Sequence, residues 1–227
     1  MTAEDLAQKI GIPLKNPDLL REALTHRSYL NEHPDWGLPH NERLEYLGDA
    51  VLELAVTEYL YHKFPNEPEG QLTVLRAALV NYQLLARVAQ EIGLEGYILM
   101  SKGERADTSK AREVILANAM ESVIGAIYLD QGFAVAKQFA EKFVLPHLSE
   151  IVEKRTYKDA KSELQEIVQE KTRITPNYKV LEETGPAHRR TFRVGVYMGD
   201  EKIGEGEGMS KQEAELDAAK NALHTQK

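Results

Sequence analysis

Apolar positions in the first two thirds of the chain recur with the spacing of amphipathic helices. This pattern covers three segments, at residues 42–63, 70–92 and 111–130. Asn16-Pro17-Asp18 has the form of an N-cap followed by proline at the first helical position. Breakers at 65–68 and at Gly103 separate the segments, and no stretch alternates convincingly with a period of two. The pattern predicts an all-helical domain over residues 1–154.

The pattern changes after a charged stretch that ends near residue 159. Residues 160–171 have apolar side chains at helical spacing, whereas 178–181 and 191–197 alternate between apolar and polar. A turn at Gly199-Asp200 leads into a third short strand around Ile203, and a last helix follows. This order of helix, three antiparallel strands and helix predicts a small α+β domain over residues 157–226. The junction at 153–158 has the composition of a flexible linker.

Two short motifs lie between the third strand and the last helix. Ser210-Lys211-Gln212-Glu213 has the form of a capping box at a helix start. Three glycines, Gly204, Gly206 and Gly208, alternate just before it. Such a run on its own is a weak signal for a nucleotide-binding loop, and we interpret it as the connection from strand to helix.

Composition narrows the class of protein. The 227 residues include no cysteine, which excludes disulfides and thiolate metal sites and favours a reducing compartment. The N-terminus has no apolar signal segment, and no apolar run is long enough to cross a bilayer, so we expect a cytoplasmic protein without a membrane partner. The net charge is −8, and most of the acidic excess lies before residue 157. An acidic chain can still bind RNA where its basic side chains gather on one face.

The first candidate for chemistry is the acidic face of segment 42–63. Glu42, Glu45 and Asp49 stand at i, i+3 and i+7, so they share one helical face. Taken alone, three acids in this arrangement are more often the solvated face of an ordinary amphipathic helix. Gly48 points the other way, because a glycine inside a helix costs about 1 kcal/mol relative to alanine and indicates that another chain segment approaches closely.

The second candidate lies in segment 111–130, which is apolar on nearly every side. Asn118 and Glu121 stand one turn apart within it. A carboxylate in a buried helix needs a partner, either an arginine such as Arg43 or Arg76, or a metal ion. The residues of this segment alone leave both open. Together with the acidic face they favour a metal, and oxygen ligands without His or Cys suit Mg²⁺ rather than zinc.

These segments resemble the ribonuclease III family. The run Asn41–Leu52 is similar to the family signature, and the regions 69–80 and 115–130 are similar to two further family blocks. The resemblance implies a metal-binding catalytic set of Glu45, Asp49, Glu121 and position 118, with Asp49 and Glu121 nearest to water activation. It also implies accessory catalytic roles around the scissile phosphate for Glu42 and Glu69. The family usually has Asp at the position of Asn118, whose amide oxygen can ligate Mg²⁺ without adding a negative charge.

The C-terminal pattern resembles the double-stranded RNA-binding domain. Such modules read the minor groove and phosphates of A-form RNA by spaced contacts. The resemblance implies RNA contacts from the first helix, from the loop after the first strand and from the start of the last helix. The residues concerned are Ser162, Gln165, Glu166, His188, Ser210 and Lys211. Gln212 stands where the family commonly has another lysine.

The resemblance as a whole implies an all-α endonuclease domain followed by an α-β-β-β-α RNA-binding domain. The implied activity is Mg²⁺-dependent hydrolysis of double-stranded RNA to 5′-phosphate and 3′-hydroxyl ends, with Mn²⁺ as a substitute metal. A homodimer is implied, in which each subunit cuts one strand, and the setting would be the processing of rRNA and mRNA. Asn118 keeps an alternative open, a catalytically impaired protein that binds double-stranded RNA.

Overall fold

The computed structural model describes residues 2–12, 15–106, 109–154, 160–185 and 190–225. They belong to two compact units, residues 1–154 and 155–227. Within the described part of the chain, no helix is both long enough and apolar enough to cross a membrane.

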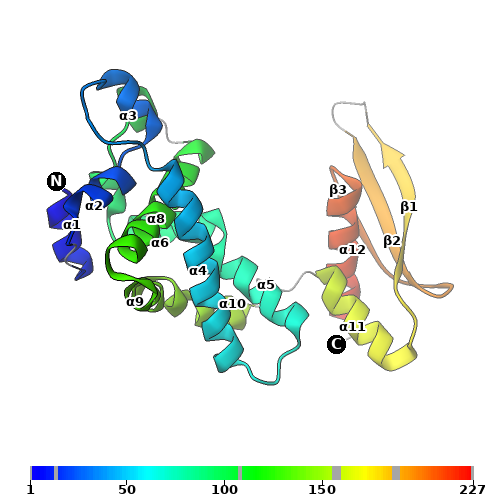
Figure 1. The fold of residues 1–227 in the computed structure, drawn as a ribbon. Helices are drawn as coiled ribbons and strands as arrows, with labels where there is room; N and C mark the ends of the chain where they lie inside the picture. The colour runs from blue at the N-terminus through cyan, green and yellow to red at the C-terminus, as the bar shows by residue number, and fades with distance from the viewer. Residues whose placement is uncertain (1, 13–14, 107–108, 155–159, 186–189, 226–227) are drawn as a thin grey trace. The chain divides into compact units, whose positions relative to one another are not determined.

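The first unit is helical, as the sequence predicts (Figure 1). Its β-structure, in the described residues, is a single isolated bridge between Thr25 and Leu99. Segments 42–63 and 111–130 are each one long helix. The helices are α1 (Ala3–Ile10), α2 (Pro17–Ala23), α3 (Arg27–Glu32), α4 (Glu42–Lys63), α5 (Glu69–Val80), α6 (Tyr82–Glu91), α7 (Lys102–Ala106), α8 (Lys110–Gln131), α9 (Phe133–Phe143) and α10 (Leu148–Lys154), with 3-10 helices η1 (Leu94–Tyr97) and η2 (Leu145–His147).

The central helix of this unit is α8, which packs against α4, α6, α9 and α2. Its middle is buried on almost every side, as its apolar sequence predicts. Asn16 caps α2 through a 3.1 Å hydrogen bond that its side chain accepts from the backbone N–H of Asp18, and Pro17 follows at the first helical position. Both features agree with the sequence pattern.

The two long helices α4 and α8 cross with their backbones in close contact (Figure 1). A Cβ atom on Gly48 would overlap the backbone carbonyl of Glu121, and one on Gly125 would overlap the carbonyl of Leu44. The close approach that Gly48 indicates is therefore confirmed, and α8 supplies the approaching segment. The crossing places the turn of α4 that follows Glu45 directly against the turn of α8 that contains Glu121.

The predicted helical segment 70–92 is wrong in one respect, because it consists of two helices. Asn81 adopts an extended backbone between α5 and α6, and its side chain accepts a 2.9 Å hydrogen bond from the backbone N–H of Leu84. Its amide also donates to the carbonyl of Ala78 at 2.9 Å. Asn81 thus caps α6 from inside a segment of continuous apolar periodicity, and local capping overrides that periodicity.

The second unit has the predicted order of helix, three strands and helix. A helix, α11 (Ala160–Thr172), precedes an antiparallel sheet in the order β1-β2-β3, and a last helix closes the unit. The strands and the last helix are β1 (Asn177–Thr184), β2 (Thr191–Met198), β3 (Glu201–Gly208) and α12 (Lys211–Thr225). Leu164, Val168, Val196, Ala218 and Ala222 lie in the core between the helices and the sheet.

The interpretation of the three alternating glycines as a connection is wrong, since they lie inside β3. A Cβ atom on Gly206 would overlap the backbone of α12 at Ala218. The glycines therefore let α12 lie directly on β3. The capping box at α12 forms in a shifted version: Ser210 Oγ accepts from Glu213 N–H at 3.1 Å, while the Glu213 carboxylate accepts from Met209 N–H at 2.8 Å.

Candidate functional site

Several acidic side chains lie near the crossing of α4 and α8, where their charges affect one another. The pKa of Glu121 is raised to about 8, and burial is the main cause. The negative charges of Asp49, Glu45 and Glu53 on α4 raise it further, in that order. Glu121 is thus a carboxyl group near other acids. Burial and their negative charges disfavour its ionised form, and a bound cation would favour it.

Glu45 is connected to both helices. Burial and the charges of Glu42 and Asp49 raise its pKa, while a hydrogen bond from the side chain of Asn118 opposes that rise. Asn118 of α8 therefore meets Glu45 of α4 through its amide. The four residues that the resemblance implies as a metal-binding set thus lie on the two crossing helices, with Asp49 exposed to solvent and Glu45 and Glu121 partly buried.

Within the described residues, neither arginine suggested as a partner forms an ion pair with Glu121. Arg76 donates a 3.2 Å hydrogen bond to Thr57. Burial raises the pKa of Glu22, and the positive charge of Arg43 opposes that rise. Among the same residues, no group of three or more His, Cys, Asp or Glu side chains converges closely enough to hold a metal ion. The acids at the crossing therefore affect one another's pKa without converging on one point.

The two accessory acids lie apart from Glu121. Glu42 faces Arg27 at 3.6 Å and His40 at 3.8 Å, and it reaches the acidic group only through its charge on Glu45. Glu69, at the start of α5, accepts a 3.1 Å hydrogen bond from Thr73. It lines a separate groove of about 440 Å³ together with Thr57, Leu60, Tyr61, Glu67, Leu72, Thr73 and Arg76.

A buried chain of hydrogen bonds fixes the start of α4 against α8. Asn41 N–H donates to the carbonyl of Thr25 at 2.9 Å, and the Asn41 carbonyl accepts from Ser122 Oγ at 3.2 Å. Ser122 Oγ also lies 2.7 Å from the carbonyl of Asn118, to which it donates within α8. Thr25, Asn41 and Ser122 are all nearly inaccessible to solvent. Buried hydrogen bonds of this kind favour one arrangement of their helices, here the one that aligns Glu45 with Asn118.

The suggested RNA-contacting residues lie on α11 and at the start of α12. Ser162 and Glu166 belong to α11, and Gln165 of the same helix is exposed. Lys211 is the exposed first residue of α12, and Ser210 caps that helix. His188 lies outside the described residues. The suggested residues of α11 and α12 therefore all belong to the second unit.

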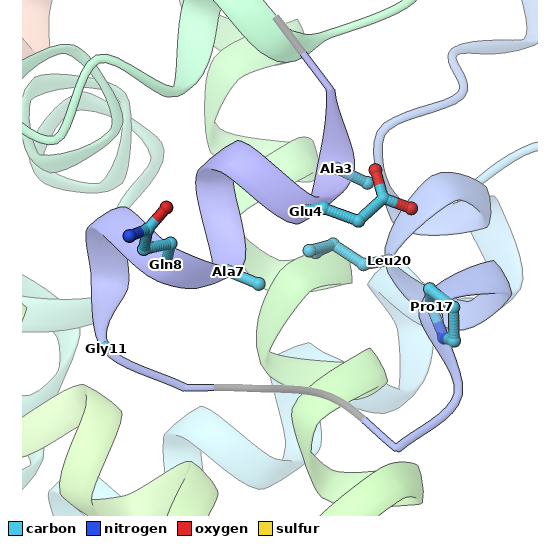
Figure 2. Close-up of a pocket in the computed structure, with 7 residues that line it drawn as sticks. All are labelled: Ala3, Glu4, Ala7, Gln8, Gly11, Pro17 and Leu20. Carbon is cyan, nitrogen blue, oxygen red and sulfur yellow. The ribbon is translucent and has the colours of Figure 1, made fainter.

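Figure 2 shows a cavity of about 460 Å³ between α1 and α2, and the acids at the crossing of α4 and α8 are not part of its lining. None of the suggested site residues lines it. Its lining is mostly apolar, and the labelled side chain of Glu4 lies at its edge (Figure 2). The lining residues are Ala3, Glu4, Ala7, Gln8, Gly11, Pro17 and Leu20.

Comparison with known proteins agrees with this arrangement. A family model described as "Ribonuclease-III-like" matches residues 16–148, which include α4, α8 and the acids at their crossing. A second model, "Double-stranded RNA binding motif", matches residues 160–226. The chain belongs to the ribonuclease III family. It is therefore a ribonuclease that carries a double-stranded RNA-binding motif.

Relatives of this family align over nearly the whole chain. The Ribonuclease 3 of Enterococcus faecalis is 46% identical over 96% of this chain and 95% of its own, and that of Pelotomaculum thermopropionicum is 45% identical over 96% and 90%. A solved structure of the nuclease domain of the Campylobacter jejuni ribonuclease III is 45% identical and has a TM-score of 0.56. The match covers 62% of this chain and 94% of the Campylobacter jejuni chain. That structure is described as showing structural flexibility in a region involved in dimer formation of the nuclease domain.

Glu53 of this ribonuclease III chain is a further acid near the site that the sequence pattern had not indicated. It stands one turn after Asp49, at i+11 from Glu42, so it continues the acidic face of α4. Its charge contributes to the raised pKa of Glu121. Extending the helical spacing by one further turn would have found it.

Proposed function

We propose that this ribonuclease III cleaves double-stranded RNA with bound Mg²⁺, leaving 5′-phosphate and 3′-hydroxyl ends. The observation that carries the proposal is the position of Glu121, a partly buried carboxyl group on α8 where that helix crosses α4, whose acids help to raise its pKa. The donors at the crossing are all oxygen atoms, which suits Mg²⁺ and admits Mn²⁺. When bound, such an ion would supply an activated water and charge stabilisation for the leaving oxygen.

Within this proposal, Glu45, Asp49, Asn118 and Glu121 hold the metal. Asp49 and Glu121 would be the residues most directly tied to water activation, as the family resemblance implies, and Asp49 is the neighbouring charge that raises the pKa of Glu121 most after burial. Asn118 contributes its amide oxygen and uses its N–H to fix the carboxylate of Glu45. These carboxylates must release their protons before they bind a cation, so metal binding by Glu121 is coupled to pH.

Accessory roles fall to the two acids outside this set. Glu42 keeps Arg27 and His40 beside the acidic group, at 3.6 and 3.8 Å. The guanidinium of Arg27 can meet a phosphate that flanks the scissile bond. Glu69 lies beside Arg76 in the groove between α4 and α5, where an acid and a cation can face the RNA backbone together.

The RNA-binding role rests on the second unit. We propose that Ser162, Gln165 and Glu166 of α11 contact one minor groove and that His188 enters the next. Ser210 and Lys211 would meet phosphates, helped by the N-terminus of α12. The exposed positions of Gln165 and Lys211 support this assignment.

We also propose a homodimer formed through α4. Tyr46, Leu54 and Tyr61 stand at i, i+8 and i+15 on this helix, and their exposed fractions are 84%, 56% and 68%. An exposed apolar stripe of this size on one helix is typical of an interaction surface. The stripe runs beside the acidic face, so a second subunit bound there would lie next to the metal ligands, and each subunit would cut one strand.

Processing of rRNA and mRNA is the biological role that fits an enzyme of this specificity. The alternative is a catalytically impaired protein that binds double-stranded RNA, and the specific observation in its favour is Asn118, which lacks the charge of an aspartate. The test is end-group analysis of a long duplex RNA after incubation with Mg²⁺. The proposal expects fragments that an exonuclease specific for 5′-phosphates degrades and that a ligase joins. Fragments with 5′-hydroxyl or 2′,3′-cyclic ends would contradict it, and an intact duplex would favour the alternative.

A further inference from the structure

One acidic residue of the second unit forms ion pairs with two cations, of which one is the proposed phosphate contact Lys211. Glu183, near the end of β1, is 3.5 Å from the Nζ of Lys211 and 3.5 Å from Nη1 of Arg190. Lys211 also lies above the ring of Phe192, the residue opposite Glu183 on β2, with 5.7 Å between Nζ and the ring centroid. The lysine is therefore held on this side of the sheet by an acid and an aromatic ring.

The neighbouring acid serves the opposite side of the sheet. Successive residues of a strand point to opposite faces, and Glu182 pairs with Arg193 at 3.0 Å. Arg193 is also 3.3 Å from Glu205 on β3. Glu182 and Glu183 are thus two adjacent exposed carboxylates with the same ordinary chemistry, of which only Glu183 pairs with Lys211 and Arg190.

A carboxylate at this place opposes the binding of a phosphate. An RNA phosphate that approaches Lys211 must displace Glu183 from it, and the displaced carboxylate remains close to the incoming negative charge. Both effects weaken binding. Resting on the proposed role of Lys211 in phosphate contact, we propose that Glu183 limits the affinity of this module for nucleic-acid backbones by competing with phosphate for Lys211 and Arg190.

Such an attenuator has a consequence for selectivity. Charge alone gives no distinction between duplex RNA and other polyanions, because phosphate contacts carry no information on sequence or sugar. Reducing the contribution of charge leaves a larger share of binding to the contacts of α11 with the minor groove, which depend on A-form geometry. Glu183 therefore weakens retention on nucleic acids that the module does not match in shape.

The test compares Glu183→Gln with Glu182→Gln in the full-length protein. Binding is measured by fluorescence anisotropy in the presence of a chelator, so that no cleavage occurs. The ligand is a duplex RNA longer than the roughly 16 base pairs that such a module spans. We expect Glu183→Gln to bind about three- to tenfold more tightly at low salt and to depend more steeply on salt concentration. Glu182→Gln should bind like the unchanged protein.

A second pair of variants separates this inference from the proposed RNA contact. Lys211→Gln should weaken binding, and Glu183→Gln added to Lys211→Gln should give a smaller gain than in the unchanged protein, because the lysine is one of the two cations released. If Lys211→Gln binds normally, the proposed phosphate contact is wrong. If Lys211→Gln weakens binding but Glu183→Gln fails to tighten it, or if Glu182→Gln tightens it equally, Glu183 is not the attenuator.

Discussion

Replacing Glu121 by Gln should stabilise the metal-free protein at high pH, although the residue is proposed to be essential for cleavage. The folded-state pKa of Glu121 is about 8, against an ordinary value of 4.5. Between these two values the folded chain keeps a proton that the unfolded chain loses. The stability of the unchanged protein must therefore fall as pH rises from about 4.5 to 8. A glutamine side chain at this position would carry no charge at any pH, so this loss should disappear.

The size of the effect follows from the shift. Each pKa unit corresponds to about 1.4 kcal/mol, so a rise from 4.5 to about 8 sets an upper limit near 5 kcal/mol. Glu121 is only partly buried, and water that reaches the carboxylate reduces the effect, so we expect about 1–2 kcal/mol. For a unit of this size, that difference moves the melting temperature by roughly 2–8 °C.

The assay is thermal unfolding of both proteins at pH 5 and pH 9, with chelator and with Mg²⁺. In chelator, Glu121→Gln should gain stability over the unchanged protein at pH 9 and little at pH 5. Mg²⁺ should reverse the order at pH 9, because a ligand that binds only the folded state stabilises the protein that binds it better. Equal pH dependence of the two proteins in chelator would refute the environment assigned to Glu121. Equal stabilisation by Mg²⁺ would refute its role as a ligand.

Three further predictions concern the same crossing and the second unit. Asn118→Asp should lower the Mg²⁺ concentration needed for half-maximal cleavage without lowering the cleavage rate. It should also destabilise the metal-free protein, because the new carboxylate faces Glu45 in place of an amide donor. Slower cleavage at every Mg²⁺ concentration would show that position 118 is not a ligand. Gly48→Ala should cost at least about 2 kcal/mol in the free energy of unfolding, because its Cβ would overlap the carbonyl of Glu121. Gly70→Ala in α5, with open space around it, should leave the protein at least as stable in the same denaturant titration. Deleting residues 157–227 should weaken binding to duplex RNA while leaving some Mg²⁺-dependent cleavage at low salt; complete loss of cleavage at low salt would contradict the assignment of the site to the first unit.

Local patterns predict much of this fold because they depend on neighbours in the sequence. The bounds of α4, the capped start of α2 and the order of elements in the second unit follow from periodicity and capping residues. Gly48 also indicates a close approach before any partner is known. The break at Asn81 escapes this reasoning, since its neighbours continue the apolar period and only the capping geometry separates α5 from α6.

The parts of the site that could not be predicted depend on long-range packing. The hydrogen bond between Asn41 and Ser122 joins residues that are far apart in the sequence, and neither residue type points to such a bond. The pairing of Glu183 with Lys211 likewise requires the sheet to bring the end of β1 to the start of α12. The proximity of Glu121 to the acids of α4 is different, because a buried carboxylate in one helix and an acidic face on another already suggest a common partner.

The most direct test of the account is the cleavage of a long duplex RNA by the unchanged protein and by Glu121→Gln, each with Mg²⁺ and with excess chelator. Glu53→Gln serves as a matched control, since it removes a neighbouring acid of the same group that is outside the proposed ligand set. The account predicts cleavage by the unchanged protein with Mg²⁺ alone, a loss of at least about a hundredfold in Glu121→Gln, and substantial activity in Glu53→Gln. Cleavage that survives either the chelator or Glu121→Gln would contradict a metal-dependent site at the crossing of α4 and α8.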